Sequence, residues 1–236
     1  MKKSMVFTCI AMLLLVFPGY AQTDWQLYDD FNSGQIDPNK WEIDDSSATI
    51  TVENGRAKFL HQAGHANDSS YLLITKSLRT IKGLRATIAI ESCSGDVRAR
   101  ISSFIGKIGD DYVYTAHEIR ADRDYISSSL SIIGPAPDYE YKKDFYWGYF
   151  KKPNVYIGSP FTMSMILSRN QASYGVEGQG ELEFSFPNTL SVTDDFFKGI
   201  GTRSVSGVGT CTVYFDNIFI LRQPIAPTDN LLLLDE

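Results

Sequence analysis

The stretch "ATITVENGRAKFL", residues Ala48–Leu60, decides the fold class of this 236-residue chain. Polar and apolar residues alternate on both sides of Asn54-Gly55. Alternation with a period of two is typical of a strand that buries one face. The Asn-Gly dipeptide accepts the positive φ angles of a type I′ turn. The segment therefore predicts a β-hairpin.

The same alternation continues through most of the chain, in short runs separated by Gly, Asn and Asp. In the run that begins at Phe161, for example, Phe161, Met163 and Met165 share one face and are expected in the core. No long stretch shows helical periodicity. We therefore expect one all-β domain over residues 22–222, a sandwich of two antiparallel sheets.

The first residues are typical of a secretory signal peptide. A basic start precedes the apolar run Met5–Phe17, and Gly19–Ala21 forms a small-x-small cleavage site. That apolar run is too short to span a bilayer, and no later segment is long and apolar enough to do so. We expect residues 1–21 to be removed, leaving a secreted protein in the periplasm or outside the cell, with residues 223–236 as a C-terminal tail.

Charge and cysteine content narrow the range of partners. With 22 basic and 28 acidic side chains the formal net charge is −6, so nucleic acid is not an expected partner. Cys9 leaves with the signal peptide, and Cys93 and Cys211 remain. In an oxidising compartment this pair predicts a disulfide, with two buried free thiols as the alternative. Two cysteines alone are too few for a zinc cage.

Four segments carry a family resemblance: "DDFNSGQIDPNKWE" (29–42), "TVENGRAKF" (51–59), "FTMSMILSRNQASYGVEGQ" (161–179) and "GIGTRSVSGVGTCTVYFDNIFI" (199–220). They resemble the concanavalin A-like lectin/glucanase superfamily, in order and along nearly the whole mature domain. The resemblance implies an antiparallel two-sheet jelly-roll sandwich, as in laminin-G-like domains. It leaves the activity open, because this fold hosts lectins, adhesive modules, glycoside hydrolases and polysaccharide lyases.

The resemblance also implies a structural Ca²⁺ as cofactor. Some glucanase-like members bind this ion on the convex side, through an early segment, the first hairpin and an acid on the last strand. Asp216 matches that acid, Gly55 matches the hairpin carbonyl, and Asp30 lies in the early segment. Calcium prefers several hard oxygen ligands of this mixed kind. The alternative is that Asp29 and Asp30 are edge-strand charges that discourage sheet-to-sheet association.

The middle strands predict a glycan-binding face. Alternation places arginines and aromatic residues of three runs on one side, and we expect the side chains of Arg100 and Arg120 to be exposed. Aromatic rings stack on sugars, and arginine contacts carboxylate or sulfate through two hydrogen bonds. The alternatives are a solvated face with cross-strand ion pairs, and Trp147 as an ordinary core residue. The expected glycan-binding residues are Arg98, Arg100, Tyr114, Glu118, Arg120, Trp147 and Tyr149.

The catalytic motifs known in this superfamily are absent or incomplete in this sequence. The glycosidase signature of this superfamily, E-x-D-x-x-E on one strand, is absent from the sequence. The segment "HEIR" (117–120) is similar to the R-x-E-L-R strand of alginate-lyase-type jelly rolls, but Ala116 stands where the first Arg belongs. Elimination would use Arg100, Tyr114, Tyr146 and His117, although alternation places His117 opposite Tyr114.

Three functions therefore remain open. The leading one is a secreted, lectin-like module that binds a polysaccharide or glycoconjugate, with the arginines pointing to an anionic glycan. The alternative is a glycan-cleaving enzyme, either a glycoside hydrolase or a polysaccharide lyase, with an unconventional site. The third is a structural or adhesive laminin-G-like module without a sugar site. A groove with exposed aromatic rings favours the first function, and a buried titratable cluster in that groove favours the second. A flat, charge-paired face favours the third.

Overall fold

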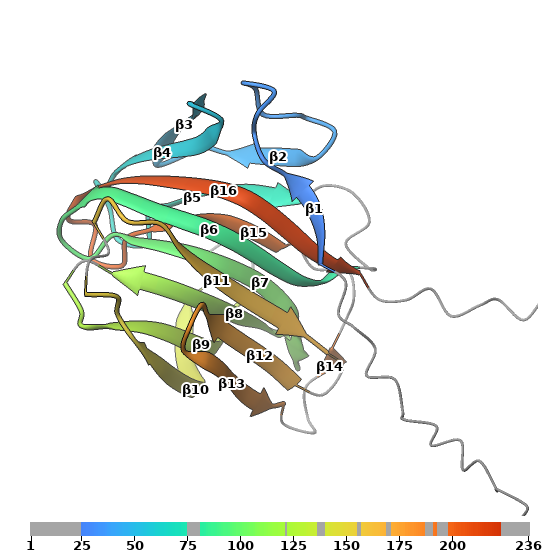
Figure 1. Cartoon of the computed structure of the whole chain (residues 1–236). Helices are drawn as coiled ribbons and strands as arrows, with labels where there is room; N and C mark the ends of the chain where they lie inside the picture. Colours follow the sequence, from blue (N-terminus) through green and yellow to red (C-terminus); the bar gives the residue numbers. More distant parts are fainter. Residues whose placement is uncertain are drawn as a thin grey trace, which may run out of the picture.

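The computed structural model describes residues 25–74, 81–120, 122–135, 140–154, 157–168, 171–186, 191–192 and 198–222 (Figure 1). All regular secondary structure in these ranges is β, which confirms the all-β prediction. The described part of the chain contains no helix that crosses a membrane. The predicted signal peptide and C-terminal tail lie outside the described residues.

One sheet, sheet A, has the strand order β13-β12-β11-β6-β16-β4-β3, with β1 paired to β16. Its ladders are all antiparallel. Sheet A therefore joins the N-terminal strand, the first hairpin and the last strand, as the family resemblance implies. Its strands are β1 (Trp25–Asp29), β3 (Ala48–Glu53), β4 (Arg56–Gln62), β6 (Ile81–Cys93), β11 (Phe161–Leu167), β12 (Gln171–Val176), β13 (Gly180–Ser185) and β16 (Thr210–Arg222).

The other sheet, sheet B, has the order β10-β9-β8-β7-β15-β5-β2, with the short β14 paired to β7. These ladders are antiparallel too. The two sheets form the predicted sandwich. The strands of sheet B are β2 (Trp41–Asp44), β5 (Ser69–Ile74), β7 (Arg98–Ile108), β8 (Asp111–Arg120), β9 (Tyr125–Ile133), β10 (Tyr141–Lys151), β14 (Ser191–Val192) and β15 (Lys198–Arg203).

The hairpin that predicts the fold class is present as β3 and β4. Asn54 and Gly55 have φ angles of 52° and 70°, the positive values that a type I′ turn requires. The register that follows pairs Val52 with Ala57 and Ile50 with Phe59. The ring of Phe59 then packs edge-on against Phe215 of β16, with ring centroids 5.2 Å apart. Local turn chemistry therefore sets the position of a core aromatic pair.

The core fills the space between the sheets. Met163 and Met165 of β11 are buried, as the alternation predicts, and they belong to one large apolar cluster that includes residues of both sheets. Apolar burial on this scale is the main favourable contribution to folding. One face of each middle strand is thereby committed to the core, and the other face is left for the outer surface.

The two adjacent acids Asp29 and Asp30, at the end of β1, have different roles. Asp29 is only 6% exposed. It accepts hydrogen bonds from the Phe31 backbone N–H at 3.0 Å and from Trp41 Nε1 at 2.8 Å. Asp29 is therefore a buried structural acid, and the expectation of an exposed edge charge is wrong for it. Asp30 accepts hydrogen bonds from the N–H and Nδ2 of Asn32 on the surface.

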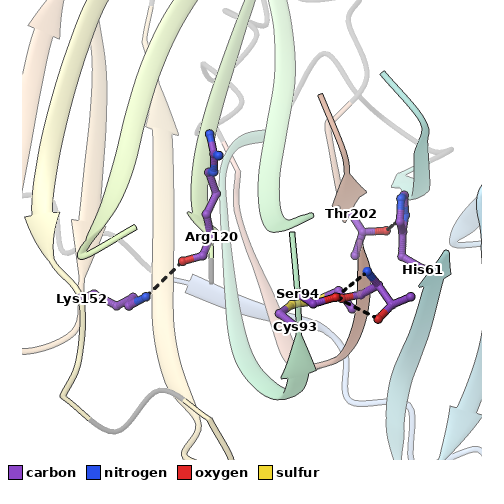
Figure 2. The surroundings of a disulfide bond; sticks show 8 residues. His61, Cys93, Ser94, Arg120, Lys152 and Thr202 are labelled. Carbon is purple, nitrogen blue, oxygen red and sulfur yellow. Dashed lines mark hydrogen bonds between the residues drawn. A yellow bond between two sulfur atoms is a disulfide. The ribbon is translucent and has the colours of Figure 1, made fainter. Parts of the chain in front are cut away.

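The predicted disulfide is present. Cys93 and Cys211 lie directly opposite each other on β6 and β16 and are bonded, 118 residues apart in sequence (Figure 2). A loop of this length corresponds to about 5 kcal/mol of stabilisation in the chain-entropy model. A buried hydrogen bond between His61 Nδ1 and Thr202 Oγ1, 2.9 Å long, joins sheet A to sheet B in the same region.

Candidate functional site

A pocket of about 420 Å³ opens on the outer face of sheet B, over β7, β8, β9, β10 and β15. We call it the arginine pocket. Six of the seven predicted glycan-binding residues line it: Arg98, Arg100, Tyr114, Glu118, Arg120 and Trp147. The seventh, Tyr149, lies beside the pocket and does not line it. The structure therefore brings six of the predicted residues together at one pocket.

Cross-strand register explains why these side chains converge. Arg100 on β7 lies opposite Glu118 on β8. Arg98 lies between Arg120 on β8 and Arg203 on β15. Neighbouring strands are only about 4.8 Å apart, so three arginines abreast repel one another unless anions or acceptors lie among them.

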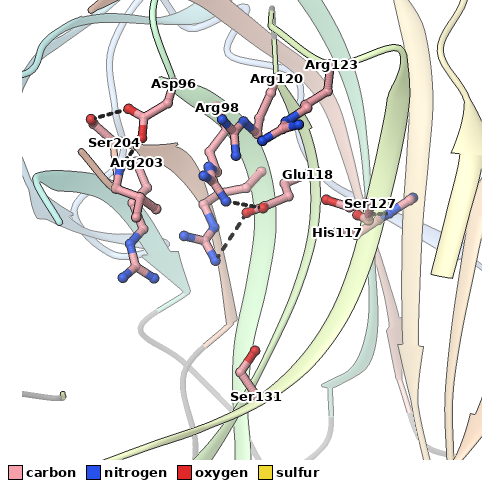
Figure 3. Close-up of polar contacts among 12 residues, drawn as sticks. Asp96, Arg98, His117, Glu118, Arg120, Arg123, Ser127, Ser131, Arg203 and Ser204 are labelled. Carbon is pink, nitrogen blue, oxygen red and sulfur yellow. Dashed lines mark hydrogen bonds and ion pairs between the residues drawn. The ribbon is translucent and has the colours of Figure 1, made fainter. Parts of the chain in front are cut away.

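Each arginine of that row has an acceptor in the folded chain. Arg98 Nη1 donates a short hydrogen bond to Glu118 Oε1 (Figure 3). Arg120 makes a bidentate pair with Asp122 through hydrogen bonds of 2.8 and 2.6 Å. Arg203 Nη2 donates to Asn67 Oδ1 at 2.7 Å. Each arginine of the row therefore bonds to a different acceptor residue. In the pocket lining as a whole, four arginines still outnumber two carboxylates, those of Glu118 and Asp144.

Glu118 is the electrostatic centre of the pocket floor. Its Oε2 lies 3.6 Å from Arg100 Nη2, while its Oε1 accepts the bond from Arg98. Burial alone would raise the pKa of Glu118, but the charges of Arg98 and Arg100 outweigh it and hold the pKa below its ordinary value. Glu118 is therefore an ionised carboxylate that fixes two guanidinium groups. It is poorly suited to act as a general acid.

The exposure of the Arg100 side chain differs from the prediction. The prediction that it is exposed is wrong, because its side chain is 1% exposed and lies under the pocket. Its guanidinium stacks over the Tyr114 ring, 4.9 Å from the ring centroid. Planar stacking of this kind orients a guanidinium while leaving N–H groups available for hydrogen bonds in the ring plane.

Several buried donors of the floor have no acceptor. In the part of the chain that the structure describes, the unpartnered buried atoms include Nε and Nη1 of Arg100, Nε of Arg98 and the hydroxyl of Tyr114. A buried donor without a partner costs about 1–3 kcal/mol. Each of these groups can donate a hydrogen bond, so an acceptor oxygen would satisfy it.

Aromatic rings form the rim next to this floor. Trp147 is 40% exposed, so the alternative that it is a core residue is wrong. Its ring lies nearly parallel to that of Tyr149, with centroids 6.2 Å apart. Tyr149 also packs edge-on against Tyr125 at 4.5 Å. Exposed, rigid aromatic surface beside a polar pocket is the arrangement on which sugar rings stack.

Sequence reasoning missed several lining residues. Arg203 comes from β15, a strand that is distant in sequence and reaches the site only through its pairing with β7. Asp144 accepts hydrogen bonds from Ser131 Oγ at 2.5 Å and from Tyr141 OH at 2.9 Å. The alternation of β10 is interrupted by register shifts on both sides of Asp144. No periodicity signal therefore assigns Asp144 to this face.

The two acids of the pocket do not form a glycosidase pair. Asp144 lies opposite Ser131, which lies opposite Tyr114, whereas Glu118 is four positions further along β8. Their backbones are therefore separated by roughly 13 Å along the strand and roughly 10 Å across the sheet. Glycosidase carboxylates lie about 5–9.5 Å apart. Conventional two-carboxylate hydrolysis does not fit this pair.

The four residues considered for elimination are divided between two faces. Arg100 and Tyr114 belong to the pocket, but His117 is fully buried in the core. Its ring nitrogens lie 3.0 Å from Ser128 Oγ and 3.1 Å from the Gly175 carbonyl oxygen. Tyr146 packs against the core and stacks on Phe184 at 4.4 Å. Alternation predicts the inward position of His117, and neither it nor Tyr146 can contact a ligand in the pocket.

The residues predicted to hold calcium gather on the other sheet. A Cβ atom at Gly55 would lie 2.6 Å from Asn32 Oδ1, so the hairpin turn touches the loop after β1. Asp216 is half-buried, and burial raises its pKa, with a further contribution from the negative charge of Asp30. Asp30, Asn32 and Asp216 supply hard oxygen atoms of the kind that calcium takes. Among the described residues, no group of three His, Cys, Asp or Glu side chains gathers anywhere as a metal cluster.

Comparisons with known proteins support the fold. No protein-family profile and no curated protein sequence matches the chain. The catalytic domain of an endo-1,3-beta-glucanase (laminarinase) from Thermotoga petrophila is similar in structure, with 13% identity, a TM-score of 0.56 and coverage of 86% of this chain and 99% of that chain.

Two further solved structures are similar. The kappa-carrageenase of Pseudoalteromonas carrageenovora, in complex with an oligotetrasaccharide of kappa-carrageenan, has 13% identity, a TM-score of 0.56 and coverage of 88% of this chain and 100% of its own. Alginate lyase A1-II' has 10% identity, a TM-score of 0.57 and coverage of 78% and 95%. These likenesses establish the concanavalin A-like jelly-roll fold of this chain, and the similar structures are largely glycan-cleaving enzymes.

Proposed function

We propose that this protein is secreted and binds an anionic polysaccharide in the arginine pocket. The observation that carries the proposal is the lining of the arginine pocket, where four arginines outnumber two carboxylates beside the exposed ring of Trp147. A carboxylate or sulfate of the glycan would pair with guanidinium groups of this lining. Charge-assisted hydrogen bonds of this type are roughly twice as strong as neutral ones.

The electrostatics of the molecule favour local rather than general attraction. The chain has a net charge of −6, yet four arginines face two carboxylates in the pocket lining. A polyanion is therefore repelled by most of the surface and attracted at one place. Such an arrangement gives specificity and accelerates association, and both effects weaken as salt screens the charges.

Each part of the pocket has a distinct role in this proposal. Arg100 and Tyr114 form the floor that contacts the anionic group, and Glu118 holds Arg98 and Arg100 in place. Arg120 and Arg203 lie at the rim, where their present acceptors Asp122 and Asn67 are exchangeable for ligand oxygens. Trp147 and Tyr149 provide the surface on which a sugar ring stacks.

Cleavage of the bound glycan is the second candidate function. Two observations favour it: the similar structures include a glucanase, a carrageenase and an alginate lyase, and the Tyr114 hydroxyl is unpartnered beside Arg100. For a uronate, Arg100 would neutralise the carboxylate, and Tyr114, as a phenolate, would take the proton from the carbon next to it. The electron pair left on that carbon would form a carbon–carbon double bond as the bond to the bridging oxygen breaks, and the Tyr114 hydroxyl would give its proton to that oxygen.

A purely adhesive module without a sugar site is less well supported. That function predicts a flat outer face with paired charges, whereas sheet B has a pocket and unpaired donors.

Titration of the mature domain with polyguluronate, kappa-carrageenan and neutral dextran tests the proposal. We expect heat of binding for at least one polyanion, a loss of affinity at high salt and no binding of dextran by the arginine pocket. The same mixtures are assayed for new reducing ends and for ultraviolet absorbance of unsaturated products. Binding without either product supports a lectin, and unsaturated product supports elimination. Failure of both polyanions to bind at low salt would overturn the proposal.

A further inference from the structure

A second groove lies on the outer face of sheet A, on the opposite side of the sandwich from the arginine pocket. Its volume is about 490 Å³, and it crosses β6, β11, β12 and β16 up to the turn before β13. Neither the resemblance nor the proposed function assigns it a role. We call it the transverse groove.

Register places its lining in rows across the sheet. One row runs through five adjacent strands: Glu181 on β13, Gly175 on β12, Ser164 on β11, Arg85 on β6 and Phe219 on β16. A second, shorter row places Thr162 opposite Thr87. Arg85, Thr87, Thr162, Ser164 and Phe219 are all partly exposed and all line the groove. The groove therefore presents three hydroxyl groups and the Arg85 guanidinium between an acidic end and an aromatic end.

Gly175 keeps the floor of this groove low. A Cβ atom at this position would lie 2.7 Å from Ser164 Oγ, closer than side chains approach each other. Any larger residue would therefore displace Ser164 and fill the groove. The backbone of Gly175 has no positive φ that would require glycine, so space rather than turn geometry explains this residue.

The charged groups at the groove are held in fixed positions. The Arg85 guanidinium stacks over the Trp25 indole, 4.2 Å from the ring centroid. Glu181 Oε2 accepts a hydrogen bond from Ser173 Oγ at 3.1 Å. With Glu177 also in the lining, two carboxylates face one guanidinium, so the balance of charge is opposite to that of the arginine pocket.

This chemistry fits a neutral sugar chain. Sugar hydroxyls both donate and accept hydrogen bonds, so they pair with carboxylates, a guanidinium and threonine or serine hydroxyls together. Phe219 offers a ring face for stacking. A polyanion would meet two carboxylates. We propose that the transverse groove is a second carbohydrate site, which binds a neutral oligosaccharide independently of the anionic glycan on sheet B.

The three tryptophans provide separate reporters for the two sites. Trp25 lies under Arg85 beside the transverse groove, and Trp147 lines the arginine pocket. Trp41 is buried, with its Nε1 bonded to Asp29, and serves as an internal control. Their indole N–H resonances are assigned in ¹⁵N-labelled mature protein from single Trp→Phe variants.

The experiment adds hexasaccharides of β-1,3-linked and β-1,4-linked glucose and of β-1,4-linked galactose to the labelled protein. We expect at least one to shift the Trp25 resonance, to leave the Trp147 and Trp41 resonances in place and to bind equally well at high salt. Glu181→Gln and Phe219→Ala are each expected to weaken this binding at least fivefold. Glu183→Gln, on the same strand and face but outside the groove, is the matched control and should bind as the wild type does.

Two outcomes would overturn the inference: no hexasaccharide shifts the Trp25 resonance, or the shift persists unchanged in the Glu181→Gln and Phe219→Ala variants. Polyguluronate and kappa-carrageenan are added separately, and their effect is read at Trp147. A failure at Trp25 with a response at Trp147 removes only the second site, and the reverse result removes only the anionic one.

Discussion

Arg100 and Glu118 lie directly opposite each other on β7 and β8, and both side chains are almost entirely withdrawn from solvent, at 1% and 3% exposure. A buried carboxylate is stable only when cations or donors compensate the loss of water. Here Arg98 and Arg100 do so together, which leaves part of the Arg100 guanidinium without an acceptor. The pair therefore links the stability of sheet B to the chemistry of its pocket.

Truncation of Glu118 should destabilise the fold. Glu118→Ala leaves Arg98 and Arg100 buried without their carboxylate, and loss of one partner of a buried ion pair costs about 3–5 kcal/mol. Urea denaturation of the mature domain measures this as a lower midpoint. Arg123→Ala is the control, because Arg123 is half-exposed and its contact with Asp122 is 3.9 Å. Equal midpoints for Glu118→Ala and Arg123→Ala would contradict the network described here.

The rim arginines offer a cleaner test of binding. Arg203→Ala and Arg120→Ala each remove one guanidinium from the pocket lining. A hydrogen bond to a charged group contributes about 1.5–3 kcal/mol, so each change should weaken polyanion binding by roughly tenfold to a hundredfold. Stability should fall by less than about 1 kcal/mol, because the Arg120–Asp122 ion pair and the Arg203–Asn67 hydrogen bond both lie at the exposed rim. Calorimetric titration and urea denaturation give the two quantities.

Arg123→Ala again serves as the matched control, since it removes the same charge from the same end of β8 without touching the pocket lining. A similar loss of affinity in Arg123→Ala would mean that general charge, and not the pocket, governs binding.

The sequence predicts which residues share a face of a strand better than it predicts which strands lie side by side. Alternation places Arg98, Arg100, Tyr114 and Glu118 on one face because period-two geometry is local. Whether that face is solvated, hollow or closed depends on strand order. Arg203 reaches the site through a pairing between strands that are far apart in the chain. No local signal contains that pairing.

The sequence predicts the exposure of side chains poorly. Alternation predicts Arg100 at the surface, but it is buried, and it allows Trp147 in the core, but it is exposed. Both outcomes follow from depth within a hollow face: a charged residue at the floor is covered by its neighbours, and an aromatic residue at the rim is not. Alternation distinguishes two faces of a strand and carries no information about depth.

Tyr114→Phe separates a functional hydroxyl from a structural one. The Tyr114 hydroxyl is buried and unpartnered, so its removal should leave stability unchanged or raise it by about 1 kcal/mol. Binding of the polyanion should weaken by at least several-fold, and any unsaturated product should disappear. The urea midpoint and the titration are measured on the same preparation. A destabilised variant that still binds normally would assign the hydroxyl a structural role.

His117 makes the fold sensitive to mild acid. Burial lowers the pKa of His117 to about 4, whereas the unfolded chain titrates near 6.5. Between these values the unfolded state binds the extra proton, so stability is complete above pH 6.5 and falls as the pH decreases towards 4. The loss from this residue is about 3 kcal/mol.

Urea denaturation across that pH range measures the effect, with His117→Gln as the comparison. The variant lacks the titrating ring, so its pH dependence should be flatter by about the same amount. Protonation of carboxylates such as Glu118, whose pKa is lowered in the fold, also reduces the stability of the protein in acid. This loss is the same in the wild type and in the variant. Parallel pH profiles for wild type and His117→Gln would show that the pKa of His117 is the same in the folded and the unfolded chain.

A calcium ion beside the first hairpin is the remaining proposal. Asp30, Asn32, the Gly55 carbonyl and Asp216 would hold it, and burial together with the charge of Asp30 raises the pKa of Asp216 in the ion-free chain. A cation there would stabilise the ionised form of Asp216 and join β1, the hairpin and β16. Because an ion that binds only the folded state stabilises it by about 2.7 kcal/mol at a hundredfold excess over its Kd, millimolar Ca²⁺ should raise the Tm and chelator should lower it.

Asp216→Asn should remove this response of the Tm to Ca²⁺. Glu91→Gln, on the adjacent strand β6 but away from this loop, should keep it. An identical Tm with Ca²⁺ and with chelator would exclude the site.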